Sequence, residues 1–587
     1  MKKFLFLFLL LSPLLMFSQT TTTVSDGNWS NSANWDNGVP NNNDNAIINH
    51  NITLDMDDKV TSVVINDTLT NGGFKLTIRE SFTNNGHFED NSGVVRFRND
   101  GPDKNIYGIV HFNRLNMNTN DSVFTNDTIY INRRLNINNG VLDVTGGILI
   151  LKNDSINTGR MGRSTSGEIV GDFIWQKWVD RCNLWSIYSS PFDATLVDIQ
   201  SASPTQMITT GFPNSSYPSF SWVNTYFYDN SLGYTTPDGL DVLSRGNGYW
   251  YWNSDTVYGG GGGPILQEWL IEVKGSMDLT TTFDFNVQHN GSDGWNLLGN
   301  PYPGTIDWDL SGWTKTNVND AIYVMNTCTG IYSTYIGGIG TNGGTKYISS
   351  GQGFWIEADV SPTLTCTQNV LTNNNANLKN SLPNNLLRIH LGDDEIVLNI
   401  TDGATGIFDS SYDGKKFISE TSRLYSFMVG DTNLTYSINS FDETVLSVPI
   451  GTKGSGTLHF DNTMYIGTYL VFLEDKHLDT WTDISNVIDY DFISTGLDDE
   501  YINDRFVIHF LDVTDVEENG NNLLSLYPNP TNNSVNISGD YEYIKVTNVI
   551  GEVVYENTYT KTVDLSQFDS GIYFFNIDGN IKKVIKK

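Results

Sequence analysis

The sequence predicts an all-β protein of several domains, and three observations lead to that prediction. Short runs rich in β-branched and aromatic residues recur along the 587-residue chain, separated by Asn-Gly, Asp-Gly and Gly-Gly turns. Aromatic residues make up 12% and charged residues only 17% of the chain, a mixture that favours strands and turns. Beyond the N-terminal segment, no window of about twelve residues repeats its apolar positions with the helical period. We expect an N-terminal β-solenoid (or sandwich), duplicated β units, a β-sandwich and a small C-terminal immunoglobulin-like β-sandwich.

Residues 1–19 have the pattern of a secretory signal peptide. Lys2 and Lys3 form a positive start, and Phe4–Leu11 is an uninterrupted apolar run. An N-terminal membrane anchor is the alternative, but the apolar run is too short to cross a bilayer comfortably, and polar residues follow at once. No later stretch of the sequence is long and apolar enough to span a membrane. The segment therefore predicts export from the cytoplasm.

The charge balance narrows the partners that we expect. The chain carries 67 acidic residues against 34 lysines and arginines, a net charge of −33. Nucleic-acid binding depends on a basic surface, so this class of function is excluded. Such acidity suits solubility outside the cell, and it leaves calcium open as a cofactor. No other cofactor is expected.

Residues 20–165 contain candidate strands at intervals of roughly fifteen to twenty residues, the spacing expected for rungs of a β-solenoid. Trp29 and Trp35 precede the first of them. The rungs share no tight consensus, so a β-sandwich remains the alternative for this domain. The candidate strands are VTSVVIN, FKLTIRE, GVVRFRN, IVHFNRL, TIYINRRLNI, GVLDV and GILILKN.

An internal repeat follows, with copy 1 at residues 175–258 and copy 2 at 265–366. Each copy has a strand, a proline turn, a middle strand, and then a Gly-x-Gly turn with an aromatic strand, in the same order. We therefore expect two related β units that pack on each other, with binding in the loops that differ between them. The run GGGGGP (259–264) predicts a flexible joint. The aligned segments are LWSIYSSPFDATLVD (184–198) with GWNLLGNPYPGTIDW (294–308), and RGNGYWYW (245–252) with SGQGFWIE (350–357).

The rest of the chain divides into a larger and a smaller β module. Residues 383–512 alternate apolar and polar positions, as expected for an antiparallel β-sandwich that buries one face of each sheet. Polar residues at 367–382 and acidic residues at 513–523 predict linkers on either side. The smaller module, 524–587, opens on LYPNP (526–530), where two prolines fix φ and remove two backbone donors. That opening belongs neither to a helix nor to a central strand.

The C-terminal module carries landmarks in a fixed order: a Tyr-Pro-Asn-Pro turn, an Ile-Gly hairpin turn, a Ser-Gly-Ile-Tyr stretch and closing lysines. In these features it resembles the type A C-terminal sorting domain of the type IX secretion system of Bacteroidetes. The resemblance implies that the outer-membrane translocon and its sorting machinery read this module, and that the passenger is secreted or attached to the cell surface by way of the periplasm and outer membrane. The residues assigned to the sorting signal are Tyr527, Pro528, Asn529, Pro530, Gly551, Gly571, Tyr573, Lys582 and Lys583.

No catalytic motif is found, so no catalytic residue is assigned, and an enzyme is the less favoured interpretation. The eight histidines form neither an HExxH motif nor a close pair for zinc, and there is no GxSxG elbow. Residues 338–343 fit GxGxxG by letter but lie in a turn-rich loop without a βαβ unit. Paired carboxylates for glycoside hydrolysis stay open, because spacing along the sequence does not give separation in space.

The run YWYW, which is Tyr249, Trp250, Tyr251 and Trp252, is the main ligand-binding candidate. Alternation along a strand places the two tyrosines on one face and the two tryptophans on the other. One face then belongs to the core, and rings on an exposed face could stack on sugars. The Phe-Trp pair at the matching place of copy 2 favours core packing instead, since positions shared by repeats are more often core.

Two weaker candidates concern a metal and a disulfide. Asp409 and Asp413 could bind calcium, although they lack EF-hand spacing and a solvated acidic turn is the alternative. Of the three cysteines, Cys328 and Cys366 are expected to form a disulfide that leaves Cys182 free, and three buried thiols are the alternative.

These observations predict an exported, multidomain surface or secreted protein that acts in adhesion or glycan binding, with glycans or surface polysaccharide as partners. The alternative is a secreted polysaccharide hydrolase or lyase. A cleft with two facing carboxylates, or with an acid beside Arg or Lys, would favour the enzyme. An aromatic platform would favour binding.

Overall fold

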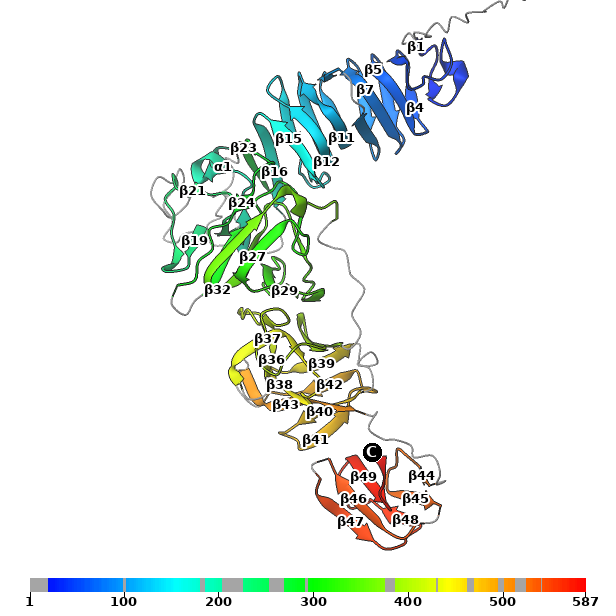
Figure 1. The fold of residues 1–587 in the computed structure, drawn as a ribbon, viewed down its shortest axis with the longest axis vertical. Coiled ribbons are helices and arrows are strands. Elements are labelled where there is room, and N and C mark those ends of the chain that lie inside the picture. Colours follow the sequence, from blue (N-terminus) through cyan, green and yellow to red (C-terminus); the bar gives the residue numbers. More distant parts are fainter. Residues whose placement is uncertain are drawn as a thin grey trace, which may run out of the picture. The chain divides into compact units, whose positions relative to one another are not determined.

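The computed structural model confirms the all-β prediction, since strands form nearly all of its elements (Figure 1). Among the described residues, α1 (Leu196–Ala202) is the one α-helix, and no helix is long and apolar enough to cross a bilayer. The chain divides into two compact units, Met1–Gly330 with Thr345–Lys379 and Ile331–Gly344 with Asn380–Lys587. The structure describes residues 19–98, 102–179, 185–202, 225–252, 269–290, 294–374, 386–428, 431–461, 469–494, 501–512, 524–539, 541–549 and 551–587.

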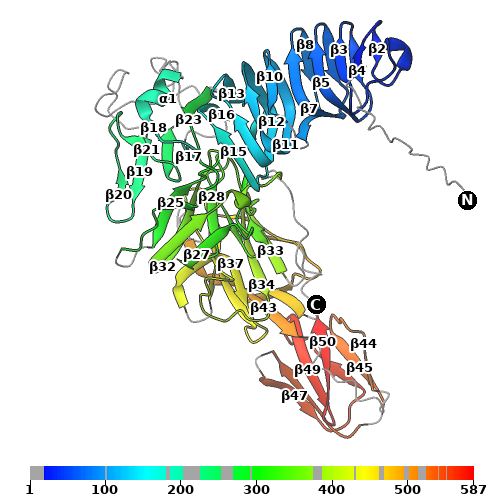
Figure 2. The ribbon, with the colours of Figure 1, turned by 45° about the horizontal axis from the view of Figure 1, so that its top comes forward.

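The first unit begins with a parallel β-solenoid, so the solenoid, and not the sandwich, is confirmed for this domain (Figures 1 and 2). Its strands are β1 (Thr20–Thr22), β2 (Gly27–Asn28), β3 (Asn45–Ile48), β4 (Ile52–Leu54), β5 (Asp58–Ile65), β6 (Thr68–Asn71), β7 (Lys75–Asn84), β8 (His87–Asp90), β9 (Val94–Arg98), β10 (Lys104–Tyr107), β11 (Val110–Thr125), β12 (Thr128–Asp143), β13 (Ile148–Leu151), β14 (Arg160–Met161), β15 (Ser166–Val170) and β16 (Phe173–Val179). The main sheet runs β1-β3-β5-β7-β10-β11-β12-β13-β16, with β9 beside β7 and β11, and with β14 and β15 beside β12; a second sheet runs β2-β4-β6-β8.

Alternation along each rung builds the solenoid core. Leu115 pairs with Leu135 on one neighbouring strand and with Val95 on the other, and all three side chains are 0% exposed. Stacked in this way, each buried aliphatic side chain contributes about 1.5–3 kcal/mol. The rings of Phe82 and Phe112 meet edge to face, with centroids 5.4 Å apart. The period of two that marks a strand in the sequence is therefore the same pattern that fills this core.

The two repeat copies complete the first unit. In copy 1 the sheet order is β17-β22-β19-β20, and in copy 2 the long strand β32 pairs with β24, β25, β27 and β28. The strand between the copies, β23, pairs antiparallel with the last solenoid strand, β16. The strands are β17 (Trp185–Ser189), β18 (Ala194–Thr195), β19 (Thr225–Asp229), β20 (Gly233–Thr235), β21 (Val242–Leu243), β22 (Gly248–Trp252), β23 (Trp269–Gly275), β24 (Phe283–Asp284), β25 (Trp295–Gly299), β26 (Ile306–Asp307), β27 (Trp313–Val318), β28 (Ile322–Met325), β31 (Tyr347–Ile348) and β32 (Gly353–Cys366). The Gly-rich joint at 259–264 lies outside the described residues.

The second unit contains a hairpin, β29 (Tyr332–Ile336) with β30 (Ile339–Thr341), and a sheet in the order β41-β40-β43-β38-β36-β37-β34-β33-β39-β42, with β35 beside β37. The strands are β33 (Leu386–Leu391), β34 (Asp394–Ile400), β35 (Gly414–Lys415), β36 (Leu424–Met428), β37 (Asp431–Phe441), β38 (Ser447–Lys453), β39 (Gly456–Asp461), β40 (Tyr469–Asp475), β41 (Thr480–Asp483), β42 (Asp489–Phe492) and β43 (Tyr501–Asp512). One core cluster, from Leu387 to Phe510, belongs to this sheet.

The C-terminal module of the same unit has two sheets, β44-β45-β48 and β47-β46-β49-β50, with a core of its own from Leu524 to Val584. Among the described residues, its strands pair only with one another. The module is therefore not woven into the preceding sandwich. Its strands are β44 (Ser525–Tyr527), β45 (Ser534–Ser538), β46 (Ile544–Asn548), β47 (Val553–Asn557), β48 (Thr562–Asp564), β49 (Gly571–Ile577) and β50 (Asn580–Lys586).

Candidate functional site: the C-terminal module and the groove between the two repeat copies

The two repeat copies pair with each other reciprocally through their Gly-x-Gly turns. In copy 1 the turn residue Asn247 forms an antiparallel bridge to Leu298 of copy 2, and the aligned residue Gln352 forms the same bridge to Tyr188 of copy 1. The hydrogen bonds correspond as well: the amide of Gly299 donates to the carbonyl of Gly246 at 2.7 Å, and the aligned Ser189 amide donates to that of Gly351 at 3.1 Å. Aligned residues thus occupy equivalent places about a local two-fold relation.

This reciprocal seam requires the glycines that mark it in the sequence. Gly246 and Gly351 have φ of 84° and 70°, a left-handed conformation that other residues rarely adopt. The second glycine of each turn has another role, because a Cβ on Gly248 would lie 2.6 Å from the carbonyl oxygen of Leu298. A Cβ on Gly353 would lie 2.3 Å from Cγ2 of Ile187. In each Gly-x-Gly pair, the first glycine therefore permits the turn, and the second permits the close approach of the other copy.

A groove lies along one side of the seam. A cavity of about 680 Å³ and a smaller one of about 220 Å³ are neighbours, since Ser244, Asn247 and Asn286 line both. Residues of both copies form the walls. The larger cavity is also lined by Pro191, Phe192, Asp193, Arg245, Gly246, Gly275, Ser276, Phe283, Asp284 and Phe285. The smaller is also lined by Phe227, Tyr228, Asp229, Asn230, Thr235, Val242, Leu243, Gly248, Tyr249, Gln288, Asn296, Leu297 and Leu298.

Arg245 is the cation of the larger cavity. Its guanidinium carbon lies 4.6 Å from the ring centroid of Phe283 and 5.3 Å from that of Tyr302, and its Nε donates to the carbonyl of Pro301 at 2.8 Å. Burial lowers the pKa of Arg245 from its ordinary value, but an arginine stays charged at neutral pH. The carboxylate of Asp193 accepts the backbone amide of Arg245 at 2.7 Å and so fixes the start of the turn. The groove thus presents a positioned cation between aromatic rings.

The smaller cavity combines aromatic rings with side-chain amides held in place by the backbone. The amide of Gln288 donates to Oδ1 of Asn296 at 2.8 Å, and Nδ2 of Asn296 donates back to the carbonyl of Gln288 at 2.9 Å. Nε2 of Gln288 donates to Oδ1 of Asn286 at 3.3 Å. Phe227 of β19 and Tyr249 of β22 line the apolar side of the cavity. Fixed amides and aromatic rings therefore line the same small cavity.

The structure divides the YWYW prediction. Tyr249 and Tyr251 are 4% and 2% exposed and belong to the core, as alternation predicts for one face. The ring of Tyr251 packs beside Tyr188, and this residue lines neither cavity of the groove. Tyr249 reaches only the floor of the smaller cavity. Trp250 is half-buried, with its ring 6.2 Å from that of Trp185, and the side chain of Trp252 lies outside the described part of the chain.

The predicted Cys328–Cys366 disulfide is wrong. Cys328 is disulfide-bonded, whereas Cys366 is a free and buried thiol. Antiparallel pairing explains the error, because Tyr323 lies opposite Trp355, so the chain running on to Cys328 heads for the start of β32 while Cys366 ends that strand. From Trp355 to Cys366 the extended strand covers roughly 35 Å, against the ~7 Å that a disulfide tolerates. Burial raises the pKa of Cys366 to about 12, and Cys182 lies outside the described residues.

Asp409 and Asp413 are held by backbone amides. Oδ1 of Asp413 accepts the amide of Ser440 at 2.7 Å, and its Oδ2 accepts the amide of Asp409 at 2.8 Å. Asp409 in turn accepts the amide of Ser411. Burial raises the pKa of Asp413 to about 7, which favours its neutral form. In the part of the chain that the structure describes, no group of three or more His, Cys, Asp or Glu side chains could hold a metal ion.

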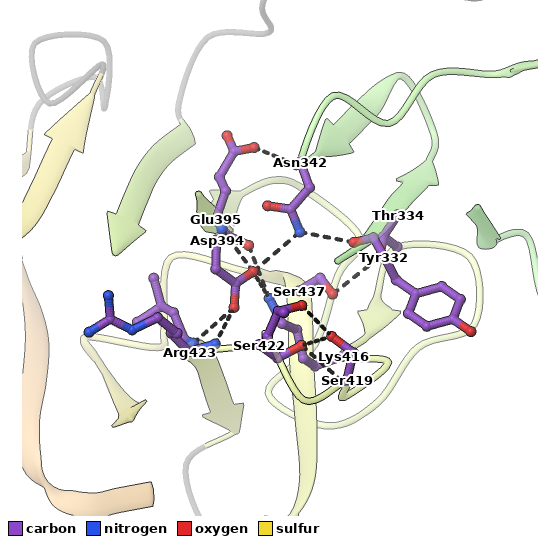
Figure 3. A network of polar contacts seen from close by, with 12 residues as sticks. Tyr332, Thr334, Asn342, Asp394, Glu395, Lys416, Ser419, Ser422, Arg423 and Ser437 are labelled. Carbon is purple, nitrogen blue, oxygen red and sulfur yellow. Dashed lines mark hydrogen bonds and ion pairs between the residues drawn. The ribbon is translucent and has the colours of Figure 1, made fainter. Parts of the chain in front are cut away.

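A buried polar network joins the hairpin β29–β30 to the sheet of the second unit (Figure 3). Oδ1 of Asp394 accepts from the ammonium of Lys416 and, at 3.3 Å, from Nδ2 of Asn342. The backbone amide of Asn342 donates to Glu395 at 2.6 Å, and the hydroxyls of Thr334 and Ser437 meet at 3.2 Å. Burial lowers the pKa of Lys416, and Asp394 opposes that shift. Oδ1 of Asn342 is buried and has no partner among the described residues, while the bonds given above tie the hairpin to the sheet, so we interpret the network as a structural fastening.

In the C-terminal module, the Tyr-Pro-Asn-Pro turn is bonded to the last strand. Nδ2 of Asn529 donates to the carbonyl of Lys583 at 2.7 Å, and its Oδ1 accepts the amide of Ile585 at 2.8 Å. The amide of Thr531 donates to the carbonyl of Ile585, and the amide of Lys587 donates to that of Thr531. The two ends of the predicted signal, far apart in sequence, are therefore one surface.

The other predicted signal residues lie in the same module. Gly551 has φ of 81° and donates its amide to the carbonyl of Asn548, which closes the β46–β47 turn. Gly571 begins β49, and Tyr573, 6% exposed, donates its hydroxyl to the carbonyl of Asp569 at 2.8 Å. Lys582 lies on β50, half-buried, as does its neighbour Lys583. Tyr527 and Pro528 lie at the turn that Asn529 anchors, and Pro530 follows it. The geometry of the module is compact, and no sequence-predicted signal residue lies outside it.

Residues 525–587 match the model of the secretion system C-terminal sorting domain. No curated protein and no solved structure matches the chain. The match covers the last module alone, and it supports the resemblance to the type IX secretion system. The sorting domain indicates a protein that is exported and then secreted or attached to the cell surface by way of the outer membrane, and it implies interaction with the secretion machinery.

Proposed function

We propose that the exported chain is a non-catalytic glycan-binding protein, acting in adhesion, and that the groove between the two repeat copies holds the sugar. The proposal rests chiefly on the smaller cavity, where rings and fixed amides face a common space. Sugars present apolar C–H faces and hydroxyl groups together, and sites for such ligands combine apolar walls with a few placed polar groups. The sorting domain supplies the setting, because the passenger reaches the exterior of the cell.

The arrangement of the amides supports binding of a neutral sugar. Gln288, Asn296 and Asn286 are linked by the hydrogen bonds given above, so the donors and acceptors are in place before a ligand arrives. A preorganised site loses less conformational freedom on binding, which raises affinity. Asn286 is exposed and lines both cavities, so it is the amide that a sugar lying along the groove would contact.

A glycan array probed with the chain from residue 20 to residue 587 tests this proposal. We expect at least one neutral oligosaccharide to bind. Asn286→Ala should weaken that binding about tenfold, the effect of losing roughly 1.4 kcal/mol of hydrogen bonding. Asn532→Ala, an exposed asparagine of the C-terminal module, is the matched control and should bind as the unaltered chain does. Absence of neutral glycan binding, or equal affinity of the two variants, contradicts the groove as the site.

A secreted polysaccharide hydrolase or lyase is the second candidate, because Asp193 and Asp284 line the larger cavity together with Arg245. Neither carboxylate is buried, and a general acid for glycoside cleavage needs an apolar setting. This is why we place binding first. Incubation with uronate and neutral polysaccharides, followed by an assay for new reducing or unsaturated ends, separates the two. Release of ends that stops in both Asp193→Asn and Asp284→Asn would establish the enzyme.

Deletion of residues 524–587 tests the route. Because the module has its own sheets and core, its removal should leave the passenger folded. We expect the truncated chain to accumulate in the periplasm and to be lost from the cell surface and medium. Surface display of the truncated chain at the level of the full chain would refute the role of this module in export.

A further inference from the structure

One face of the solenoid is basic, although the chain as a whole carries a net charge of −33. The strands that form it are β5, β7, β9, β11, β12 and β14, whose order follows from their parallel pairing. Figure 2 labels β5, β7, β11 and β12 of this set. The face, here called the basic face, holds Lys59, Lys75, Arg79, Arg96, Arg98, Arg114, Arg134 and Arg160.

The register places these side chains in rows across the strands. Arg114 pairs with Arg134, and Arg134 pairs with Arg160, so three guanidinium groups follow one another on neighbouring strands. A second row begins at Lys59, passes through Thr77 and reaches Arg96, and Asn116 and Asn136 continue it. Neighbouring strands lie about 4.8 Å apart, so each row repeats at that interval.

The burial pattern shows that these rows point outward. The residues that alternate with them are 0% exposed and fill the core, so the intervening side chains project from the opposite side of each strand. The buried set is Leu76, Ile78, Val95, Phe97, Leu115, Met117, Leu135 and Ile137. Most cations of the basic face reach the outer surface, since Lys59 and Arg98 are exposed and the others, except Arg160, are half-buried. Thr77, Asn136 and Arg160 are only 3%, 6% and 9% exposed and lie beneath that surface.

The cations of the basic face are mostly held by neutral groups. Lys75 has a carboxylate partner, Asp57 at 2.6 Å. Arg114 instead donates to the carbonyls of Ser92 and Gly93, and Arg134 donates to the carbonyl of Asn373. Nε of Arg134, with Oδ1 of Asn116 and of Asn136, is buried and has no partner among the described residues. These atoms lie below the surface, and what remains for a ligand is the positive charge of Arg114 and Arg134, whose guanidinium groups donate to neutral carbonyls.

Like charges opposite each other on neighbouring strands destabilise a sheet. Burial, and after it the charges of Arg134 and Arg133, lower the pKa of Arg160 to about 10. Burial, Arg114 and Arg133 lower the pKa of Arg134 in the same way. A negatively charged group that bridged this row would relieve the repulsion. The fold thus keeps an arrangement that costs stability unless an anion is bound.

We propose that the basic face binds a linear anionic polysaccharide, one that carries carboxylate or sulfate groups. Its charges repeat at the spacing of the strands, which is close to the length of one sugar residue, and arginine pairs with carboxylate and sulfate in bidentate fashion. Asn116, half-buried and opposite Arg96, can donate its side-chain amide to a hydroxyl group. This site is separate from the groove, and it does not depend on the function proposed for the groove.

The outward positions favour a polysaccharide over a nucleic acid. Single-stranded nucleic acid is bound by aromatic side chains on which the bases stack. The rows described here consist of Lys, Arg, Thr and Asn, with Val94 beside Arg114, and contain no ring. A polymer with charged groups and hydroxyls but no flat bases fits this surface better.

Binding of the chain from residue 20 to residue 587 to polygalacturonate and to dextran sulfate, measured over a range of salt concentrations, tests the proposal. Neutral dextran and duplex DNA are the comparison ligands. One double variant, Arg96→Gln with Arg98→Gln, removes a half-buried and an exposed cation. A second, Arg114→Gln with Arg134→Gln, removes two half-buried cations of the row that ends at Arg160. The control, Lys274→Gln with Lys561→Gln, removes the same charge from exposed positions elsewhere. Circular dichroism and the melting temperature report folding of each variant.

We expect at least one of the anionic polysaccharides to bind, more tightly than duplex DNA and far more tightly than dextran. Each basic-face pair should weaken binding at least tenfold, and the slope of log K against log salt should shrink by about two, one for each lost contact. The control should bind as the unaltered chain does. Tighter binding of DNA, absence of binding at low salt, or equal weakening by the control overturns the proposal. If Arg114→Gln with Arg134→Gln fails to fold, the result for Arg96→Gln with Arg98→Gln decides.

Discussion

The two repeat copies use the same turn in different ways. In copy 2 the turn Ser350–Gly353 is covered by the solenoid: Nε1 of Trp175 donates to the hydroxyl of Ser350 at 2.9 Å, and the ammonium of Lys177 donates to its carbonyl at 3.2 Å. A Cβ on Gly351 would lie 2.7 Å from the ring of Trp175. In copy 1 the aligned turn Arg245–Gly248 borders the larger cavity instead.

The difference shows how a duplicated unit acquires two roles. The seam between the copies is symmetric, since aligned residues make aligned hydrogen bonds, and it needs both turns. The surroundings are not symmetric, because Trp175 and Lys177 of β16 donate to the turn of copy 2, whereas the turn of copy 1 borders the larger cavity. Copy 2 therefore anchors the pair to the solenoid, and the equivalent surface of copy 1 remains available as a groove.

The largest expected effect comes from removing the anchor. Trp175 is 1% exposed, and Trp175→Ala should destabilise the first unit by about 3–5 kcal/mol, since it leaves a cavity and breaks the bond to Ser350. Thermal unfolding of the full chain measures this. A loss of less than about 1 kcal/mol would mean that the solenoid does not anchor copy 2.

Thermal unfolding measured over a range of pH identifies the transition of the sandwich, because Asp413 makes its stability depend on pH. Transitions without this dependence can then be assigned to other parts of the chain. Burial raises the pKa of Asp413 from 3.8 to about 7, so between these values the folded state keeps a proton that the unfolded state releases. The stability that Asp413 contributes is complete below about pH 4 and is lost as the pH rises through 7. We expect a loss of about 2–3 kcal/mol between pH 5 and pH 8. Asp413→Asn should remove this slope, and an unchanged slope would assign it to another group.

The symmetry of the seam can be tested with matched alanines. Gly248→Ala and Gly353→Ala each place a methyl group against the other copy, and each should cost about 2 kcal/mol. Because the two contacts are equivalent, the two losses should agree to within roughly 1 kcal/mol. Gly571→Ala, where a Cβ meets nothing within 4 Å, is the control. Strongly unequal losses would show that one copy alone supports the seam.

The smallest expected effect on stability comes from making the turn of copy 1 like that of copy 2. Arg245→Ser introduces the residue found at the aligned position and removes the contacts with Phe283 and Tyr302, at a cost of about 1 kcal/mol. Glycan affinity should fall while the melting temperature changes little. Calorimetric titration with the sugar identified on the array measures the first quantity. Unchanged affinity would separate Arg245 from the groove's ligand.

Local period and turn chemistry were enough to predict much of the fold. Strand alternation predicts that Tyr249 and Tyr251 share one face of their strand, and rung spacing favours the solenoid over the sandwich, because both patterns depend on neighbours along the chain. The Gly-x-Gly landmarks likewise predict the repeat from the sequence alone. The groove was not predictable in the same way, since Asn247 and Asn286 are 39 positions apart and only the reciprocal seam brings them together.

The errors have the same physical origin. Three cysteines predict one disulfide but do not identify the pair. The antiparallel register sends Cys328 and Cys366 to opposite ends of β32, so these two cannot form it. The net charge of the whole chain does not predict the basic face, because acidic residues elsewhere outweigh these cations. The signal was present: basic residues occupy outward positions of successive candidate strands, as in FKLTIRE, GVVRFRN and IVHFNRL. When the outward positions of each candidate strand are examined for charge separately from the inward positions, they predict the basic face.

The bonds from Asn529 to both sides of the last strand have a practical consequence for anyone who grafts this tail onto another passenger. A graft of only the closing lysines would arrive without the turn that holds their strand in place. A cassette should start ahead of Leu524, whose side chain is part of the module's core, and end at Lys587, whose amide is already engaged by Thr531. Purification tags belong upstream of that cassette.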